Sequence, residues 1–383
     1  MRFRLAALGA LLFGAAPHPA FAQKAPETRL TKAEARYSEP FSSITGLIPL
    51  PDGRVLVSDG IDETLLRLDL RSGKTDTIGR KGAGPGEYTT PDALFAIENG
   101  QTLLVDLGNG RLSIFDATGK YRQSIPIARG QPGLGLTILV PRGADKQGRL
   151  YFQPGGPGGG ADSGAVVRFD RTGEKMDTVV RIGLPATKVT SSGGAGNRSV
   201  SVRPVPLSPA DAWAVAPDGR LAVARSTGYR VEWIHPDGRF VRGPPNTVRP
   251  VAIRDADKKE WMDEMANGLS VQVRAENGRM DVRLGRGGAR REDPDPSQFE
   301  WPASKPAFTG RMWISLEGDA WVERSVPAGQ PRAYDVFGAD GRLQRTVMLP
   351  VERRVLGFGQ GAVYVQHTDP DDGLQYLERY KTP

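Results

Sequence analysis

The sequence predicts an all-β fold, a six-bladed β-propeller of four-stranded antiparallel blades. In this prediction an N-terminal strand closes the last blade, and one small helical insertion interrupts the ring. Three observations support it. A glycine turn followed by an alternating strand recurs six times along the chain. Further short apolar strands accompany each copy, so that one unit holds four strands. Glycine and proline, with 48 and 31 of the 383 residues, supply turns for many short strands.

The first half of the repeat is a turn that ends in glycine and leads into a strand, as in PDGRVLVSD at 51–59. Asp-Gly and Asn-Gly place a residue of positive φ in a tight hairpin turn, and alternating apolar residues bury one face of the strand. The glycines that open the six copies are Gly53, Gly100, Gly148, Gly219, Gly318 and Gly361. Their separations of 47, 48, 71, 99 and 43 residues indicate a period of about 45 with two insertions, which is typical of propeller blades.

The second half of the repeat is a strand, a turn and a further strand, as in RLSIFDATGKYRQS at 111–124. A short apolar strand, such as ALFAI at 93–97, precedes the first half and completes a unit of four. The last copy is truncated to LQYLERY at 374–380 and lacks its fourth strand. Residues 28–38 precede the first blade, and we expect them to supply the missing strand and close the ring without an exposed edge.

The two long separations predict insertions between blades three and four, at about 183–208, and between blades four and five, at about 247–306. The first insertion is polar and rich in Gly, Ser and Pro, which indicates a loop. In the second, apolar residues recur at helical spacing over 257–269, and Asp257 is placed to cap that helix. The arginine-rich stretch 271–296 that follows is expected to be mobile.

Residues 1–22 have the pattern of an export signal, in which Arg2 and Arg4 precede a short apolar stretch. Cleavage is expected near Ala22, which leaves 23–383 as a propeller in the periplasm or outside the cell. The apolar stretch is too short to span a bilayer, so no transmembrane segment is expected. The chain has no cysteine, which excludes disulfides and thiolate metal sites. Its net charge of +7 is a mild excess that does not indicate nucleic-acid binding.

The segment GRKGAGPGEYTTP at 79–91 joins the first blade to the second and carries a family resemblance. It matches the pattern G-R-x-G-x-G-P-G-E-[FY] at Gly79, Arg80, Gly82, Gly84, Pro85, Gly86, Glu87 and Tyr88. With this segment, the repeat, and the helix-bearing insertion followed by WVER at 321–324, the chain resembles exported bacterial six-bladed propellers of the TolB-like and NHL-like superfamily. The resemblance covers nearly all of the chain after residue 22. It implies the fold but assigns no function, because propellers host binding and catalysis alike.

The glycines of this segment do not form a phosphate-binding loop. Such a loop requires Gly-Lys-Ser or Gly-Lys-Thr at the start of a helix, whereas Gly86 is followed by Glu87, Tyr88 and a predicted strand. We therefore interpret the segment as a connector between blades. Arg80 and Glu87 are candidates to reach the mouth of the central channel.

The sequence offers few groups for catalysis. Only His235 and His367 remain after the leader, and no Ser-His-Asp arrangement is evident. Gluconolactonase-type propellers, which share the predicted fold, hold a divalent cation with oxygen ligands around the central channel. Asp59 and Asp106 occupy equivalent places at the end of the second strand in blades one and two, and Glu323 lies close to that place in blade five.

The same place in the other three blades is taken by Gln153, Arg225 and Gln366. This mixture does not form an evident metal cage, so hydrogen bonding to adjacent loops is the favoured interpretation. The long insertion also carries Arg274, Arg279, Arg283, Arg286, Arg290 and Arg291. Without interleaved aromatic residues this stretch does not resemble a platform for single-stranded nucleic acid. A solvated loop is favoured, with docking to an acidic partner as the alternative.

The leading functional hypothesis is a monomeric, exported, non-enzymatic propeller without a cofactor, which binds a protein, peptide or glycan through the loops of one ring face. The candidate binding residues are Asp59, Arg80, Glu87, Asp106, Arg225 and Glu323. The alternative is a hydrolase or lactonase with carboxylates at the central channel, dependent on calcium or another divalent cation. A third possibility is a scaffold for envelope assembly.

Overall fold

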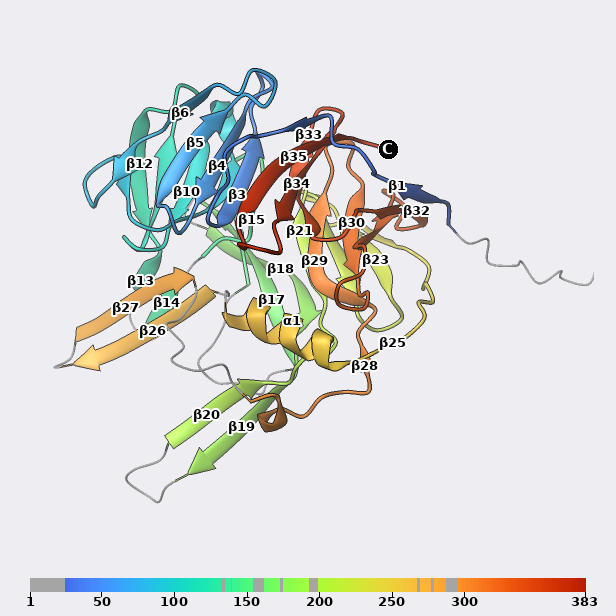
Figure 1. The fold of residues 1–383 in the computed structure, drawn as a ribbon. Coiled ribbons are helices and arrows are strands. Elements are labelled where there is room, and N and C mark those ends of the chain that lie inside the picture. Colours follow the sequence, from blue (N-terminus) through green and yellow to red (C-terminus); the bar gives the residue numbers. More distant parts are fainter. Residues whose placement is uncertain are drawn as a thin grey trace, which may run out of the picture.

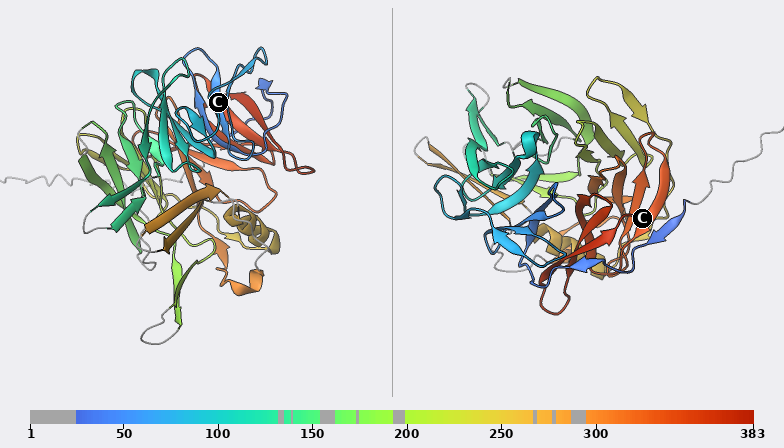
Figure 2. Two further views of the ribbon diagram at one scale, coloured as in Figure 1. Left: turned by 90° about the vertical axis from the view of Figure 1, so that its left-hand side faces the viewer. Right: turned by 90° about the horizontal axis from the view of Figure 1, so that it is seen from above.

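Six antiparallel sheets surround a central axis in the computed structural model, as Figures 1 and 2 show. The structure describes residues 25–131, 135–138, 140–153, 162–172, 175–192, 199–266, 269–276, 279–286 and 295–383. In each blade the first strand lies nearest the axis, and each later strand pairs outward with the one before it. The predicted six-bladed propeller is therefore confirmed.

The first three blades follow the predicted four-strand order. Blade one consists of β3 (Ile44–Pro49), β4 (Val55–Asp59), β5 (Thr64–Leu68) and β6 (Thr75–Thr77). Blade two consists of β9 (Pro91–Ala96), β10 (Thr102–Asp106), β11 (Arg111–Phe115) and β12 (Tyr121–Pro126). Blade three consists of β15 (Gly143–Ala144), β16 (Leu150–Phe152), β17 (Ser163–Asp170) and β18 (Lys175–Gly183).

The last three blades repeat this order with two additions from the N-terminal part. Blade four consists of β21 (Ala212–Val215), β22 (Leu221–Arg225), β23 (Arg230–Ile234) and β24 (Phe240–Arg242). Blade five consists of β29 (Phe308–Ile314), β30 (Ala320–Arg324), β31 (Ala333–Phe337), β32 (Leu343–Met348) and the added strand β1 (Glu27–Arg29). Blade six consists of β33 (Arg353–Gly359), β34 (Ala362–Thr368), β35 (Gln375–Lys381) and the added strand β2 (Ala35–Arg36).

The ring closes as predicted. Strand β2 pairs antiparallel with β35, with Ala35 opposite Arg379, and so supplies the fourth strand that the truncated last copy lacks. Strand β1 was not predicted. It pairs parallel with β32, with Thr28 opposite Val347, and gives blade five a fifth strand.

The insertions hold more regular structure than expected. The stretch 183–208, predicted as a loop, contains the hairpin of β19 (Thr187–Ser192) and β20 (Ser199–Pro204). The β-branched Val and Thr residues within this polar stretch favour extended backbone, which the Gly and Ser content obscured. A further hairpin, β13 (Ala128–Gln131) with β14 (Gly135–Ile138), lies between blades two and three.

The long insertion contains the only helix longer than one turn in the described part of the chain, α1 (Asp255–Ala266). The helix begins two residues before the predicted start and ends before Leu269, which opens a hairpin of β26 (Leu269–Glu276) and β27 (Arg279–Arg286). This hairpin occupies part of the stretch expected to be mobile. The short pair β25 (Val251–Ala252) and β28 (Ser304–Lys305), with the 3-10 turn η2 (Pro296–Gln298), completes the insertion.

The connections place all of these insertions on one face of the ring. Because strands alternate in direction, links from the fourth strand of one blade to the first strand of the next leave from the same face. We call this the connector face. The opposite face carries the turns between the first and second strands of each blade, and we call it the turn face. These turns lie near Gly53, Gly100, Lys146, Gly219, Gly318 and Gln360. Figures 1 and 2 show α1 and the inserted hairpins on a single side of the ring.

Neighbouring blades pack closely, as blades four and five illustrate. The indole N–H of Trp233 donates to the carbonyl oxygen of Gly338 at 2.9 Å. A Cβ on Gly243 would stand 2.0 Å from the carbonyl oxygen of Gly341, so only glycine fits there.

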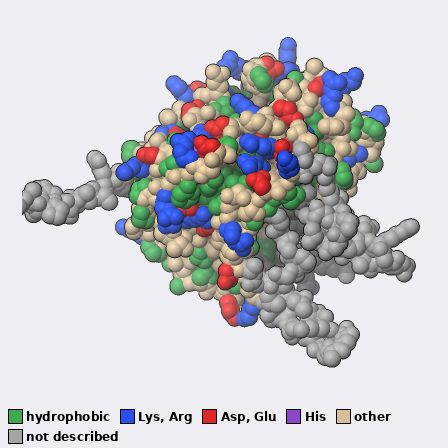
Figure 3. Space-filling view, turned by 180° about the vertical axis from the view of Figure 1, so that it is seen from behind, with side chains coloured by type: hydrophobic (Ala, Val, Ile, Leu, Met, Phe, Trp, Pro, Cys, Tyr) green, Lys and Arg blue, Asp and Glu red, His purple; other side chains and the backbone are tan. Residues whose placement is uncertain are grey.

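On the face seen from behind, Figure 3 shows Lys and Arg interspersed with Asp and Glu. No helix in the described part of the chain is long and apolar enough to cross a membrane.

Candidate functional site

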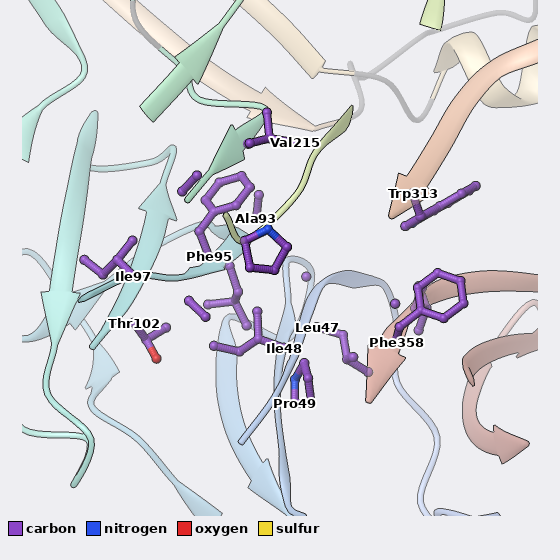
Figure 4. A pocket seen from close by; sticks show the side chains of 18 of the residues that line it. Leu47, Ile48, Pro49, Ala93, Phe95, Ile97, Thr102, Val215, Trp313 and Phe358 are labelled. Atoms are coloured by element: carbon purple, nitrogen blue, oxygen red, sulfur yellow. The ribbon is translucent and has the colours of Figure 1, made fainter. Parts of the chain in front are cut away.

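A cavity of about 2380 Å³ runs along the centre of the ring. Its wall is formed by the first strand of every blade, that is β3, β9, β15, β21, β29 and β33. Figure 4 shows Leu47, Phe95, Val215, Trp313 and Phe358, from five of these strands, around a shared space. We refer to this cavity as the channel.

The wall of the channel is mainly apolar. Aromatic and long aliphatic side chains come from several blades, including Leu47, Phe95, Phe152, Trp213, Met312, Trp313, Leu356 and Phe358. Six charged residues of the described part of the chain line it, namely Arg71, Asp92, Glu98, Arg142, Lys146 and Arg379. Two of these are neutralised within the protein, since Glu98 pairs with Arg171 and Arg379 pairs with Glu34. An apolar wall with few polar groups is typical of a ligand site.

The channel wall also offers backbone hydrogen-bonding groups. Each of the six inner strands is the terminal strand of its sheet and pairs with one neighbour only. Half of the N–H and C=O groups of such an edge strand have no partner within the sheet. Strand β3, for example, pairs with β4 along one edge, and its other edge faces the channel.

The channel opens on the turn face. Residues from the first-to-second turns of all six blades line it, including Pro51, Gly100, Lys146, Pro217, Leu316 and Gln360. Leu316 is 51% exposed and marks the rim of this mouth. A ligand therefore enters most directly from the turn face, away from the insertions.

Helix α1 lies against the other end of the channel. Glu264, near the end of α1, pairs with Arg354 at 2.6 Å and with Arg311 at 3.6 Å. These arginines belong to β33 and β29, the inner strands of blades six and five. Burial would raise the pKa of Glu264, but the charges of Arg354 and Arg311 outweigh it and lower the pKa. The helix is thus anchored at the connector-face end of the inner strands.

Glu323 belongs to this anchor. It is fully buried and accepts from Arg332 at 2.8 Å, while Arg354 stands 3.5 Å away. Arg332 also bonds Glu260 of α1 at 3.0 Å. The sequence-predicted Glu323 is therefore bound to two arginines beneath α1 and does not line the channel.

Asp59 and Asp106 hold backbone segments at the connector face. The buried carboxylate of Asp59 accepts from the backbone N–H groups of Ser43, Ile61 and Asp62 at 2.9–3.2 Å. That of Asp106 accepts from the N–H of Thr89 at 3.2 Å and from the side chain of Asn109 at 2.7 Å. These bonds fix the chain where it enters the first strand of each blade, as the favoured interpretation of these residues expected.

Arg225 and the pair of Arg80 and Glu87 also lie outside the channel wall. Arg225 bonds Asp211 at 2.9 Å and Glu232 at 2.6 Å. Burial would lower its pKa, but the hydrogen bond to Glu232 and the other acidic contacts outweigh this and raise it.

The connector holds the last two candidates. Arg80, in β7 (Arg80–Lys81), donates to Glu87, in β8 (Glu87–Tyr88), at 2.7 Å. Glu87 also accepts from the N–H of Gly84 at 2.7 Å, and the side chain of Arg80 is 81% exposed. All six sequence-predicted residues therefore make contacts outside the channel, and the structure does not bring them together.

No protein-family model matches the chain, and no curated protein matches its sequence. Among solved structures, it is similar to the calcium-binding protein regucalcin from Agrobacterium tumefaciens, with 16% identity, a TM-score of 0.43, and coverage of 94% of this chain and 97% of that one. It is similar to a gluconolactonase from Xanthomonas campestris, with 12% identity, a TM-score of 0.40 and coverage of 92% and 94%. It is also similar to virginiamycin B lyase from Staphylococcus aureus, with 10% identity, a TM-score of 0.41 and coverage of 92% and 99%. Such values do not carry those activities over to this chain.

The carboxylates proposed for a channel metal do not fit that role. Asp59, Asp106 and Glu323 stand in different blades, and N–H or guanidinium donors occupy each of them. Among the described residues, no group of three or more His, Asp or Glu side chains is arranged to hold a metal ion. His235 and His367 lie in blades four and six, where His235 contacts Arg239 at 2.9 Å and His367 stacks near Tyr376.

The channel residues themselves were not predicted as a site. The signal was present in the inner strands, whose sequences ITGLIPL, ALFAI, AWAVA and MWISL are apolar at successive positions. In a strand that buries one face, apolar and polar residues alternate. A strand that packs between blades and also borders a cavity is apolar on both faces. Continuous apolar character in the first strand of each unit therefore marks the channel wall.

Asp106→Ala is expected to lower the free energy of unfolding by about 1–3 kcal/mol, because it leaves the N–H groups at Thr89 and Asn109 without their buried acceptor. Chemical denaturation followed by tryptophan fluorescence measures the change. Addition of calcium, zinc or manganese is expected to affect the melting temperatures of wild type and variant equally. A metal-dependent rise in melting temperature that Asp106→Ala abolishes would instead support a metal site.

Proposed function

We propose that this protein is a non-enzymatic binding propeller, exported to the periplasm or beyond the cell, that takes an apolar peptide segment into its channel. The observation that carries the proposal is the channel itself, with its apolar wall from all six blades and its mouth on the turn face. Removing apolar surface from water supplies the binding free energy. The loops that flank the mouth then contact the rest of the partner.

Two features of the wall favour a peptide over a glycan or an alkyl chain. The unpaired edges of the inner strands match the alternating donors and acceptors of an extended peptide. An alkyl chain would leave these groups without partners, at a cost for each buried group. A glycan would need many polar side chains for its hydroxyls, and the wall has few.

The hydrolase or lactonase alternative requires carboxylates at the channel that can hold a metal or activate water. The three acidic residues named for that role are bound at the connector face. No specific contact in the described part of the chain favours catalysis. We therefore propose binding without turnover, and without a cofactor.

The proposal is tested with two pools of synthetic hexapeptides that have free C-termini. One pool draws every position from Ala, Val, Leu and Phe, and the other from Gly, Ser, Thr and Gln. Wild-type protein is expected to retain the apolar pool, and Phe95→Ser in the channel wall to weaken binding about tenfold, since it removes much of one buried aromatic contact. Retained peptides are identified by mass spectrometry, and their affinities are measured by fluorescence polarisation.

The matched control is Phe240→Ser, at a phenylalanine that is 46% exposed on the outer strand β24 and does not line the channel. It is expected to bind like wild type. Leu316→Ser, at the exposed rim, tests the same site without disturbing the core. Equal retention of the two pools, or equal effects of Phe95→Ser and Phe240→Ser, would overturn the proposed function.

A further inference from the structure

Arg142 is an unneutralised cation in the apolar channel. It directly precedes β15 and lines the cavity. Its guanidinium contacts no carboxylate among the described residues. Two of the other charged residues that line the channel, Arg379 and Glu98, are paired elsewhere. The surrounding walls lower the pKa of Arg142 through burial, although its side chain remains reachable from the cavity.

Two neighbours hold the guanidinium of Arg142 in place. Its Nη1 donates to the side-chain oxygen of Gln153 at 2.6 Å, and the guanidinium carbon lies 5.6 Å from the ring centroid of Trp213. The same oxygen of Gln153 accepts from the indole N–H of Trp213 at 3.0 Å. These contacts use one of the five guanidinium N–H donors and leave an adjacent pair for a bidentate acceptor. Because the group is already ordered, an anion that binds it incurs little further entropic cost.

The position of Arg142 indicates which part of a peptide would reach it. The channel mouth lies on the turn face, and Arg142 lies inside the channel, four residues before the rim residue Lys146 of the same blade. At the connector-face end of the inner strands, Glu264 of α1 lies against Arg311 and Arg354. A peptide that enters from the turn face therefore arrives at Arg142 end-first.

We propose that Arg142 binds the C-terminal α-carboxylate of the apolar peptide, and this inference rests on the proposed function. The carboxylate supplies the missing countercharge and accepts two parallel N–H bonds, while the apolar side chains contact the wall toward the mouth. The protein then selects free, apolar chain ends over internal segments of a chain.

The test compares three forms of a hexapeptide retained from the apolar pool. One has a free C-terminal acid, one is its C-terminal amide, and one is the amide with Glu at its last position. In wild type, we expect the acid to bind about tenfold to a hundredfold more tightly than the amide, the range for a hydrogen-bonded charged group. In Arg142→Gln this ratio is expected to fall to about one, with the amide bound as in wild type.

Lys146→Gln is the control, since Lys146 is a cation at the rim of the same blade and is expected to keep the ratio. Arg142→Lys, which retains the positive charge, is expected to keep part of the acid-to-amide affinity ratio. Melting temperatures verify the folding of every variant. A wild-type ratio near one, a ratio unaltered by Arg142→Gln, or binding of the Glu amide equal to that of the acid would overturn the inference while leaving the proposed function intact. Equal retention of the apolar and polar pools would overturn both.

Discussion

Asp335→Ala is expected to lower the free energy of unfolding by about 3–5 kcal/mol, the cost of removing one partner from a buried ion pair. Asp335 is fully buried in β31. It accepts from the Tyr229 hydroxyl at 2.7 Å, from Arg324 Nε at 2.9 Å and from the Thr346 hydroxyl at 2.9 Å. The alanine variant leaves the cation of Arg324 and the hydroxyl of Tyr229 without this acceptor. Since Tyr229 belongs to blade four, the contact between two blades is weakened as well.

Urea denaturation followed by tryptophan fluorescence measures this loss. Asp340→Ala is the matched control, because Asp340 lies in the β31–β32 turn of the same blade with its side chain 59% exposed. It is expected to change the stability by less than about 1 kcal/mol. An unfolding midpoint for Asp335→Ala equal to that of the control would contradict the importance of the buried pair.

The blades were predictable because each of them depends on local chemistry. The glycines of the first-to-second turns adopt positive φ, as at Gly53 (87°), Gly219 (85°) and Gly318 (91°), and such backbone is recognisable from Asp-Gly and related turns. The truncated last copy also indicated the closing strand β2. Strand β1 was not predictable, because the three residues Glu27–Arg29 are too few to show a periodicity and pair with a strand more than 300 residues away.

The candidate site was less predictable, because it depends on how six distant strands converge. Asp59, Asp106, Arg225 and Glu323 share a place at the end of the second strand, which on sequence alone is compatible with a ring of ligands around the channel. In the structure this place holds connectors and α1, so each side chain acts within its own blade or its neighbour. Arg142 carried no sequence signal, since its role depends on Gln153 and Trp213 from two blades.

Asp257→Ala is expected to release α1 from the ring. Asp257 is buried in the first turn of the helix and accepts from the N–H of Arg254 at 2.8 Å and of Ala328 at 2.7 Å. Lys305, itself 7% exposed, lies 2.6 Å from the carboxylate. Loss of the carboxylate leaves the buried ammonium of Lys305 with weaker contacts. It is expected to lower the free energy of local unfolding of α1 by about 3 kcal/mol. Hydrogen–deuterium exchange is expected to accelerate in α1 while the blade strands keep their protection.

The control for this variant is Asp255→Ala, two residues earlier on the same helix, where the side chain is 95% exposed. Its exchange is expected to match wild type, and equal exchange in the two variants would contradict the anchoring role of Asp257.

The contact between Asp257 and Lys305 also predicts that the protection of α1 depends on pH. Burial would raise the pKa of Asp257, but Lys305 and the two N–H donors outweigh it and lower the pKa in the folded protein. The unfolded chain therefore binds a proton first as the pH falls, so the anchor contributes fully above about pH 4 and is lost in stronger acid. Protection of α1 should decline more steeply over that acidic range in wild type than in Asp257→Ala, in which Glu264 still makes an acid-sensitive contact with Arg354.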